Sequence, residues 1–225
     1  LPAALPIALL PDRGVRGALA KAFARAQTRA LRTGALRAAY TELLSAIDTT
    51  AEGVAADYLD KKLQVAFEEK MRYFAKRIAE TELHRAYAAE QAAELMADTD
   101  VAYVQWRMSP AHPVEDICDY FARVDKYGLG PGIYPKGRAP VAPAHPFCKC
   151  VLTPRLDMDE REVEEIDGAD QAYFSRLGLK DARRVAGSKA KLEQIQGGRS
   201  AWDVHNANID PRYHVKTVEV AANTP

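Results

Sequence analysis

A stretch rich in proline and glycine, residues 109–146, most limits what this chain can fold into, because neither a long helix nor a long strand can run through it. A loop of this length is rarely without a role in a compact domain, and its few apolar residues cannot pack by themselves. Cys118 and His145 lie within this segment, and Cys148 and Cys150 follow directly after it. These side chains are the candidates for holding the segment together.

The same four side chains form a set that zinc favours, because zinc prefers four tetrahedral ligands drawn from cysteine thiolates and histidine nitrogens. A bound ion would close a loop that cannot pack on its own. Two alternatives stay open on the sequence: three reduced thiols with no metal, and a disulfide from Cys118 to Cys148 or to Cys150. An odd number of cysteines fits a reducing, intracellular environment better than a disulfide scaffold.

The proposed ligand set departs from the common zinc pattern of two Cys-x-x-Cys pairs. Phe121 stands where a second cysteine would complete the first pair, so Asp119 or His112 is an alternative ligand. A catalytic metal would need an open coordination position and a nearby general base, for which Glu115 and Asp116 qualify only by proximity along the chain. We therefore expect a structural metal rather than a catalytic one.

Residues 13–100 are rich in alanine and carry apolar residues at three- and four-residue steps, which predicts helices. A first helix is expected to reach about residue 47, and a second to run from about Thr50 to Met96 without an interrupting proline. The second would exceed the usual length of a globular helix, so it is expected to have a break or a partner helix. Two antiparallel helices joined near residue 49 are the simplest arrangement.

Overall charge is balanced, with 31 basic and 31 acidic residues, which argues against a protein that coats nucleic acid electrostatically. Basic residues within 13–37 can still form one basic face. The apolar opening segment, residues 1–12, is interrupted by prolines and has about half the length needed to cross a bilayer. We expect it to be extended and to dock on an apolar surface, we expect no membrane partner, and the start at Leu1 predicts processing or further upstream residues.

Composition changes after residue 100. Residues 101–110 carry valine, tyrosine and tryptophan and are typical of a strand, and residues 147–156 are typical of a second strand that pairs with the first. Trp106 is expected to lie in the core. Residues 101–155 are thus predicted to form a compact two-stranded module around the cysteines.

Residues 156–225 are predicted to form short helices that end in an edge strand. The helical segments are 157–166, 169–178, 179–187 and 188–198, and the alternating segment 215–220 is the predicted edge strand. Eight acidic residues between 157 and 170 predict a solvated acidic helix, or a face that meets a basic partner or keeps DNA at a distance. The expected fold is mostly α-helical with a small α+β unit, divided at residues 1–12, 13–100, 101–155 and 156–225.

A second group of polar residues lies near the C-terminus, where His205, His214, Asp203 and Asp210 surround a turn. Such residues occur in metallo-nucleases, but this spacing matches no motif with a mechanical reason behind it, so we expect surface turn residues. The sequence contains no glycine-rich phosphate loop and no G-x-S-x-G nucleophile motif. We therefore expect no enzymatic activity.

Four segments follow one another along the chain: RIAETELHRAYAAE (77–90), YVQWRMSP (103–110), DICDY (116–120) and HPFCKCVLTP (145–154). This order of an Arg…Thr-Glu helix, a tryptophan strand, a cysteine segment, a loop and a His-Pro-x-Cys-x-Cys strand resembles the Mu F-like family of phage head-morphogenesis proteins. The similarity covers roughly residues 50–155. Arg77, Thr81 and Glu82 match the helix motif and Trp106 matches the strand motif, whereas Phe121 departs from the family's second cysteine.

The resemblance implies a minor head protein of a tailed bacteriophage, present in a few copies in the virion near the portal and in the host cytoplasm during assembly. Its expected partners are the portal protein, the major capsid protein or copies of itself. From their spacing on the helix, Arg77, Thr81 and Glu82 are expected either to form a polar clasp between the helix and the cysteine module or to lie on a solvated face with local ion pairs. Two other functions stay open: a phage-borne toxin or hydrolase that carries such a region, and an internal head protein that contacts packaged DNA through residues 13–37.

Overall fold

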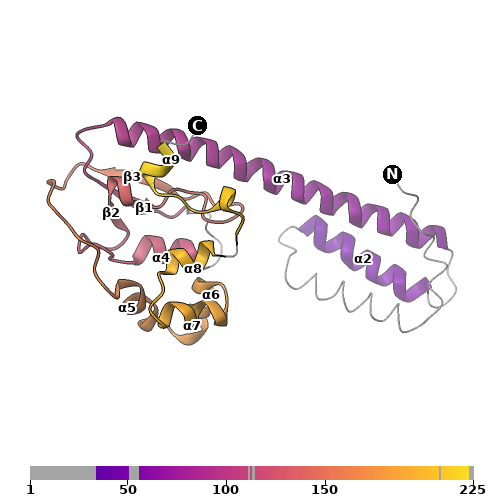
Figure 1. Cartoon of the computed structure of the whole chain (residues 1–225). Coiled ribbons are helices and arrows are strands. Elements are labelled where there is room, and N and C mark those ends of the chain that lie inside the picture. Colours follow the sequence, from indigo (N-terminus) through magenta and orange to yellow (C-terminus); the bar gives the residue numbers. More distant parts are fainter. Residues whose placement is uncertain (1–33, 51–55, 111, 113–114, 208, 223–225) are drawn as a thin grey trace. The chain divides into compact units, whose positions relative to one another are not determined.

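The computed structural model describes residues 34–50, 56–110, 112, 115–207 and 209–222 (Figure 1). Its elements follow in the order α2 (Gly34–Thr50), α3 (Ala56–Ala97), β1 (Tyr103–Arg107), α4 (Ile117–Arg123), β2 (Ile133–Pro135), η2 (Lys136–Arg138), β3 (Val151–Arg155), α5 (Ala169–Ser175), α6 (Leu179–Ala186), α7 (Lys189–Gln196), α8 (Ala201–Asn206), η3 (Pro211–Tyr213) and α9 (Val218–Ala222). The chain forms two compact units, Leu1–Arg77 and Ile78–Pro225. The predicted class, mostly helical with a small α+β unit, is confirmed.

In the first unit, α2 packs along the N-terminal part of α3. The buried residues of α2 recur every three or four positions and form one apolar cluster with α3: Leu36, Ala39, Tyr40, Leu43 and Ala46. Lys62 pairs with Glu42 at 2.6 Å, and the Lys70 ammonium lies 6.0 Å from the centre of the Tyr40 ring. Residue numbers therefore rise along α3 as they fall along α2, and the predicted antiparallel helices are confirmed.

Part of what the sequence predicts for the N-terminal region falls on residues that the structure does not describe. The extended segment at residues 1–12, the beginning of the first predicted helix and most of the basic face at 13–37 lie outside the described residues. The second predicted helix is observed as α3, unbroken from Ala56 to Ala97. No described helix has both the length and the apolar composition required to cross a membrane.

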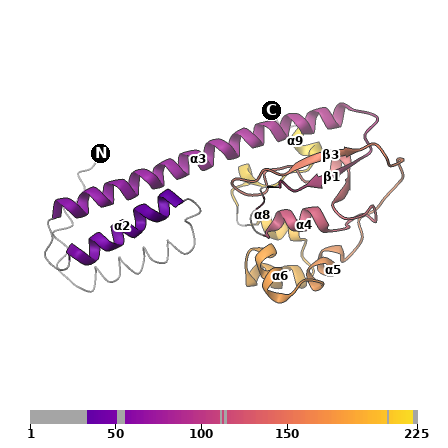
Figure 2. The same ribbon diagram turned by 180° about the vertical axis from the view of Figure 1, so that it is seen from behind.

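The second unit contains a three-stranded antiparallel sheet in the order β2-β1-β3. The two predicted strands are confirmed as β1 and β3, with Tyr103 opposite Arg155 and Arg107 opposite Val151. The sheet lies between the C-terminal part of α3 and α4, and both views show the short helices α5 and α6 beyond α4 (Figures 1 and 2). The strand β3 thus leads directly out of the segment that contains the last two cysteines.

A third strand corrects the predicted two-stranded module. The loop between residues 109 and 146 contains β2, which pairs with β1 through Gln105 opposite Ile133 and Tyr103 opposite Pro135. The strand β2 has only three residues, follows Gly132 and ends in a proline, so it is too short for an alternating pattern to be recognised in the sequence. Its proline is tolerated because β2 is an edge strand.

A buried polar network joins α4 to two of the short helices that follow the sheet, α5 and α8. The Tyr120 hydroxyl donates to Asp170 Oδ1 at 2.5 Å, and the other oxygen of Asp170 accepts from the backbone N–H of Ala201 at 2.8 Å. Lys126, itself buried, lies 3.8 Å from Asp170 and 3.0 Å from Glu165. One buried carboxylate therefore ties α4 to the starts of α5 and α8, and its pairing offsets the cost of burying it.

The predicted acidic helix at residues 157–166 is wrong, because this segment forms no helix. Tertiary hydrogen bonds take the backbone groups that a helix would use. The Tyr103 hydroxyl donates to the carbonyl of Arg161 at 2.7 Å and accepts from its N–H at 2.9 Å, and the N–H of Ile166 donates to Lys126 O at 2.8 Å. Repulsion among closely spaced carboxylates also disfavours the helix.

The predicted edge strand at residues 215–220 is also wrong. Its strand character is limited to one bridge between Thr217 and Pro140, and the helix α9 begins at the next residue. Val215, Val218 and Ala221 are buried, whereas Val220 is exposed. Burial at three-residue steps favours the helix over the alternation that the sequence suggested.

Gly132 allows α4 to lie close to the start of β2. A Cβ at this position would lie 2.5 Å from the backbone oxygen of Ala122, and its φ of +70° is in the region that favours glycine. Gly132→Ala is therefore expected to lower the free energy of unfolding by about 2–4 kcal/mol, measured by chemical denaturation. Gly198→Ala is the matched control, because φ is +99° there but no atom lies within 4 Å of a Cβ. Equal losses in the two variants would contradict the steric explanation.

Candidate metal centre

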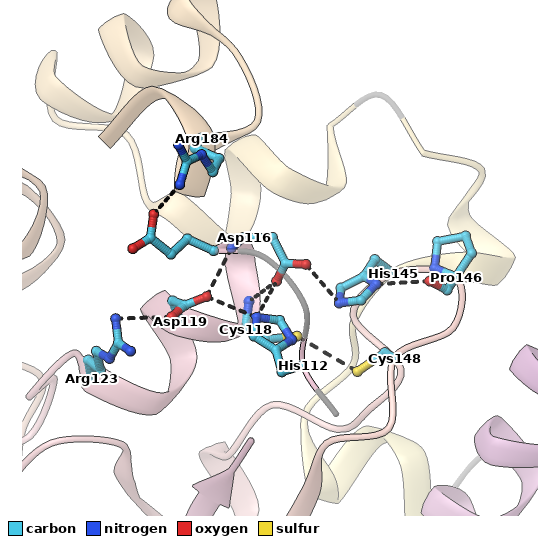
Figure 3. Close-up of polar contacts among 10 residues, drawn as sticks. His112, Asp116, Cys118, Asp119, Arg123, His145, Pro146, Cys148 and Arg184 are labelled. Carbon is cyan, nitrogen blue, oxygen red and sulfur yellow. Dashed lines mark hydrogen bonds and ion pairs between the residues drawn. The ribbon is translucent and has the colours of Figure 1, made fainter. Parts of the chain in front are cut away.

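The three cysteines come together because two elements position them from opposite ends of the proline-rich segment. Cys118 is the second residue of α4, whose N-terminus is fixed by a capping box between Asp116 and Asp119. Cys148 and Cys150 immediately precede β3, which pairs with β1 in the sheet that α4 covers. Figure 3 shows the sulfur atoms of Cys118 and Cys148 facing each other.

A tight turn brings His145 next to Cys148. The N–H of Cys148 donates to His145 O at 3.0 Å, with Pro146 and Phe147 at the two central positions. Phe147 has a φ of +63°, where a glycine is usual, and such a backbone costs about 1–3 kcal/mol. The surrounding contacts must therefore stabilise a conformation that this residue type disfavours.

The ligand atoms of Cys118, His145 and Cys148 all lie within 4.8 Å of one another. The two sulfur atoms are 3.7 Å apart and all three cysteines are free thiols, so the disulfide alternative is not formed. Two thiolates on one tetrahedral zinc ion, with Zn–S distances of about 2.3 Å, lie about 3.8 Å apart. The separation of the sulfurs therefore matches a shared metal.

Cys150 belongs to the same thiol cluster, although its sulfur lies outside the 4.8 Å group. Its side chain is buried and interacts with the thiols of both Cys118 and Cys148. Backbone N–H groups approach the sulfurs: that of Cys150 approaches Cys148, and that of Ser109 approaches Cys150. Such donors stabilise thiolates and are typical of the surroundings of metal-bound cysteine.

The thiols have unequal acidities because they share protons. Hydrogen bonds from Cys118 and Cys150 lower the pKa of Cys148 far below its ordinary value, whereas the hydrogen bond with Cys148 raises the pKa of Cys118 far above it. The cluster thus favours one thiolate, at Cys148, before any cation arrives. Cation binding would remove the remaining protons, because metal ligands must be deprotonated.

His145 offers the nitrogen that a metal requires. Its Nδ1 donates to Pro146 O at 2.9 Å, so Nε2 is the ring nitrogen that a metal would take. This Nε2 is buried, makes no well-directed hydrogen bond and lies 3.1 Å from Asp116 Oδ2. A buried nitrogen without a hydrogen bond, beside two thiols, fits a metal ligand.

One face of α3 clasps the cysteine segment. Thr81 Oγ1 accepts from the N–H of Phe147 at 3.2 Å, His84 Nε2 donates to Cys150 O at 2.9 Å, and Gln91 Nε2 donates to Leu152 O at 3.0 Å. The expected clasp is confirmed for Thr81, whose partner is the strained residue of the turn. His84 and Gln91 were not anticipated, although their spacing from Thr81 places all three on one helical face.

The other two residues of the helix motif behave differently. Glu82 pairs with Arg85 along α3 at 3.3 Å and makes no described contact with the cysteine segment. Arg77 ends the first unit. The clasp therefore depends on the side of α3 that carries Thr81, His84 and Gln91.

Removing the Thr81 hydroxyl tests the clasp. Thr81→Val keeps the shape of the side chain but leaves the Phe147 N–H without its acceptor, so the free energy of unfolding should fall by about 1–2 kcal/mol. Urea denaturation of the full chain measures the change, and Thr81→Ser, which retains the hydroxyl, should recover most of it. Loss of the same size in both variants would mean that the hydroxyl has no such role.

The alternative ligands and the candidate general bases take other partners. Asp119 is buried and lies 3.0 Å from both Arg123 Nη1 and His112 Nε2, so it does not join the sulfur cluster. Glu115 pairs with Arg184 at 2.6 Å, and Figure 3 shows Arg184 away from the sulfurs. Asp116 faces His145 and is considered below.

Phe121 is a core residue. It stands at the position where a second cysteine would complete a Cys-x-x-Cys pair with Cys118. Its side chain is fully buried, and its ring centre lies 5.1 Å from that of Trp106 and 5.5 Å from that of Trp202. The predicted core position of Trp106 is confirmed. A ligand at position 121 is replaced by aromatic packing.

The C-terminal histidines form no metal cluster among the described residues. His205 Nε2 donates to Ala144 O and His214 Nε2 donates to Ile209 O, each at 2.8 Å. Asp210 accepts from the backbone and the guanidinium of Arg212. His214 and Asp210 thus belong to a local turn, as the sequence predicted. For His205 the prediction of a surface turn residue is wrong, because it lies in α8 and bonds to the distant loop at Ala144.

His205 is expected to make stability depend on pH. Burial lowers its pKa below the ordinary value of 6.5, so the unfolded chain binds a proton more readily than the folded one. The free energy of unfolding should therefore decrease as the pH falls below about 6.5. Urea denaturation at pH 7.5 and 5.5 should show a smaller decrease in His205→Gln than in the parent. An unchanged difference would exclude His205 as a source of the dependence.

No family model matches the chain, and no curated protein or solved structure matches it either. The chemistry of this chain must therefore be read from its own geometry. That geometry places Cys118, His145, Cys148 and Cys150 close together as a possible metal site, clasped by α3.

Proposed function

We propose that this protein is a structural assembly protein, a minor head protein of a tailed bacteriophage, whose cysteine module is closed by zinc. The observation that carries the structural role is the burial of the thiols: Cys118, Cys148 and Cys150 are 0%, 2% and 1% exposed. A substrate cannot reach sulfurs enclosed in this way. The phage role rests on the motif order of residues 77–154 and its resemblance to the Mu F-like family.

Zinc is the proposed ion because thiolate and imidazole ligands in tetrahedral geometry select it among common cations. Cys118, Cys148, Cys150 and His145 would hold it, and its contribution when bound is to crosslink the chain. Cys118 would join α4 to the turn before β3, and Thr81 and His84 would fix that turn against α3. The proline-rich loop between the ligands would then be closed without needing a core of its own.

The helix pair is the proposed surface for protein partners. Phe67, Met71 and Phe74 are exposed large apolar residues of α3, spaced four and three apart and therefore on one helical face. Such a stripe suits the portal protein, the major capsid protein or another copy of the chain. We infer a location in the virion, at the capsid interior or portal vertex.

Two measurements test this proposal. Elemental analysis of the purified full-length chain should give about one zinc per chain, with loss of the ion in Cys148→Ser and retention in His214→Asn. Quantitative mass spectrometry of particles assembled from the genome that encodes the chain should find a few copies in each particle. A zinc-free chain would remove the metal from the proposal, and purified infectious particles that lack the chain would remove the head role.

A second candidate, contact with packaged DNA, is favoured by the outer face of α6. Lys180 and Arg183 are exposed on this helix and have no acidic partner among the described residues, while Arg184 beside them pairs with Glu115. Binding of a DNA duplex should weaken steeply with salt and fall in Lys180→Glu/Arg183→Glu but not in Lys61→Glu. Equal binding by all three chains would reject α6 as a DNA contact.

A further inference from the structure

A second group of potential ligands adjoins the thiols and shares His145 with them. One ligand atom each of His112, Asp116 and His145 lies within 4.8 Å of the others. Figure 3 shows the three side chains converging: His112 from the loop before α4, Asp116 from the N-cap of α4, and His145 from the turn before β3. Unlike the sulfurs, all three side chains are partly exposed.

The Asp116 carboxylate lies between the two imidazoles. Its Oδ1 is 3.7 Å from His112 Nε2, and its Oδ2 is 3.1 Å from His145 Nε2. Two imidazoles and one carboxylate are the set that binds first-row transition metals on one side and leaves the other positions to water. The arrangement therefore has the donors of a metal site with harder ligands than the thiol cluster.

Each imidazole has a further contact. The Nε2 of His112, which faces Asp116, lies 3.0 Å from the buried carboxylate of Asp119, so a cation at this nitrogen would displace Asp119, whose pairing with Arg123 would remain. The Nδ1 of His145 donates to the carbonyl of Pro146. These contacts restrict both rings before any cation binds.

His145 has one free nitrogen, so it can serve only one of the two groups at a time. Of the proposed zinc ligands it is also the most accessible, with 21% of its side chain exposed against almost none for the thiols. Among the proposed zinc ligands, the side chain of His145 is therefore the one that a cation from solvent meets most readily, and its Nε2 faces Asp116.

We propose that His112, Asp116 and His145 form a second transition-metal site, through which zinc enters the cysteine cluster; the entry role rests on the function proposed above. The cation is captured by these three partly exposed side chains and passes to the thiols while His145 remains bound. Each thiol that joins the ion releases its proton to solvent, and Asp116 and His112 return to their present contacts.

Loading kinetics test the entry role. Zinc uptake by the reduced, metal-free full chain, followed with a chromophoric chelator, should slow at least fivefold in His112→Asn while the final zinc content stays the same. His214→Asn, a histidine outside both groups, should load at the parent rate. Uptake by His112→Asn at the parent rate would overturn the entry role.

Direct binding tests the site itself. In a Co²⁺ titration, the triple variant Cys118→Ser/Cys148→Ser/Cys150→Ser, which has no thiolate to give charge-transfer bands, should still bind one Co²⁺ per chain, more weakly than the parent. His112→Asn in that background should weaken binding at least tenfold. Equal Co²⁺ affinity with and without His112→Asn would overturn the second site. If the triple variant fails to fold, the loading rate of the folded His112→Asn chain decides the proposal.

The same cobalt titration distinguishes failure of this proposal from failure of the proposed zinc site at the cysteine cluster. A parent chain with no thiolate-to-cobalt band would reject the cysteine site of the proposed function, while binding that depends on His112 and lacks thiolate bands would still support the second site. If the parent chain shows thiolate-to-cobalt bands and His112→Asn loads zinc at the parent rate, the zinc site at the cysteine cluster is supported and the entry role is rejected.

Discussion

Chelating the metal from the full-length chain is expected to unfold the unit Ile78–Pro225 at temperatures at which the loaded chain stays folded. Structural zinc contributes roughly 10–16 kcal/mol of apparent binding free energy, which is as large as the whole stability of many domains. Here the proposed ligands join α4 to the turn before β3, so their release would open the loop between them. The midpoint measured by calorimetry should fall by at least about 10 °C.

The first unit provides an internal control for this experiment. Amide exchange should accelerate after chelation across residues 117–155, whereas α2, which carries no proposed ligand, should keep its protection. Cys148→Ser should reproduce the loss and should not respond further to the chelator. Identical melting of the parent with and without chelator would contradict a structural metal.

Trp106→Ala is expected to cost about 3–5 kcal/mol of unfolding free energy, the largest effect of any single core substitution considered. Trp106 is 1% exposed, lies on the central strand β1 and packs on Phe121. Truncation would leave a cavity between the sheet and α4, the helix that carries Cys118. Chemical denaturation of the metal-loaded chain measures the loss.

Trp106→Phe separates packing from hydrogen bonding. The indole N–H is buried and has no hydrogen-bond partner among the described residues, so phenylalanine removes volume but none of the described hydrogen bonds and should cost clearly less than alanine. Leu83→Ala, at a highly exposed position of α3, should change the free energy by less than about 0.5 kcal/mol. Equal losses for Trp106→Phe and Trp106→Ala would point to an unseen partner of the indole.

Packing at position 121 explains how the module differs from a zinc site with two cysteine pairs. The aromatic cluster of Phe121 with Trp106 and Trp202 joins α4, the sheet and α8. A cysteine at position 121 would bury less apolar surface and would lose the contacts of the Phe121 ring with the two tryptophans. The remaining ligands must come from the segment before β3, which is where His145, Cys148 and Cys150 lie.

Long-range contacts explain the errors in the C-terminal region. The acidic segment has helix-forming residues, but its backbone groups bond to Tyr103 and Lys126, far away in sequence. The alternating pattern at residues 215–220 predicted a strand, but a helix begins at Val218 because it allows Val215 and Val218 to be buried together. Local propensity is a weak influence where a segment is short and tertiary partners are strong.

The sequence by itself determined the antiparallel helices, the strands β1 and β3, and the candidate set of Cys118, His145, Cys148 and Cys150, because periodicity and ligand chemistry are local properties. Only the tertiary structure decided which donors meet. It placed Asp119 with Arg123 rather than with the thiols, brought Thr81 and His84 onto the cysteine turn, and set Asp116 against the free nitrogen of His145. The physical reason is that these contacts join residues from separate elements, and their geometry exists only after α3, α4 and the sheet have packed together.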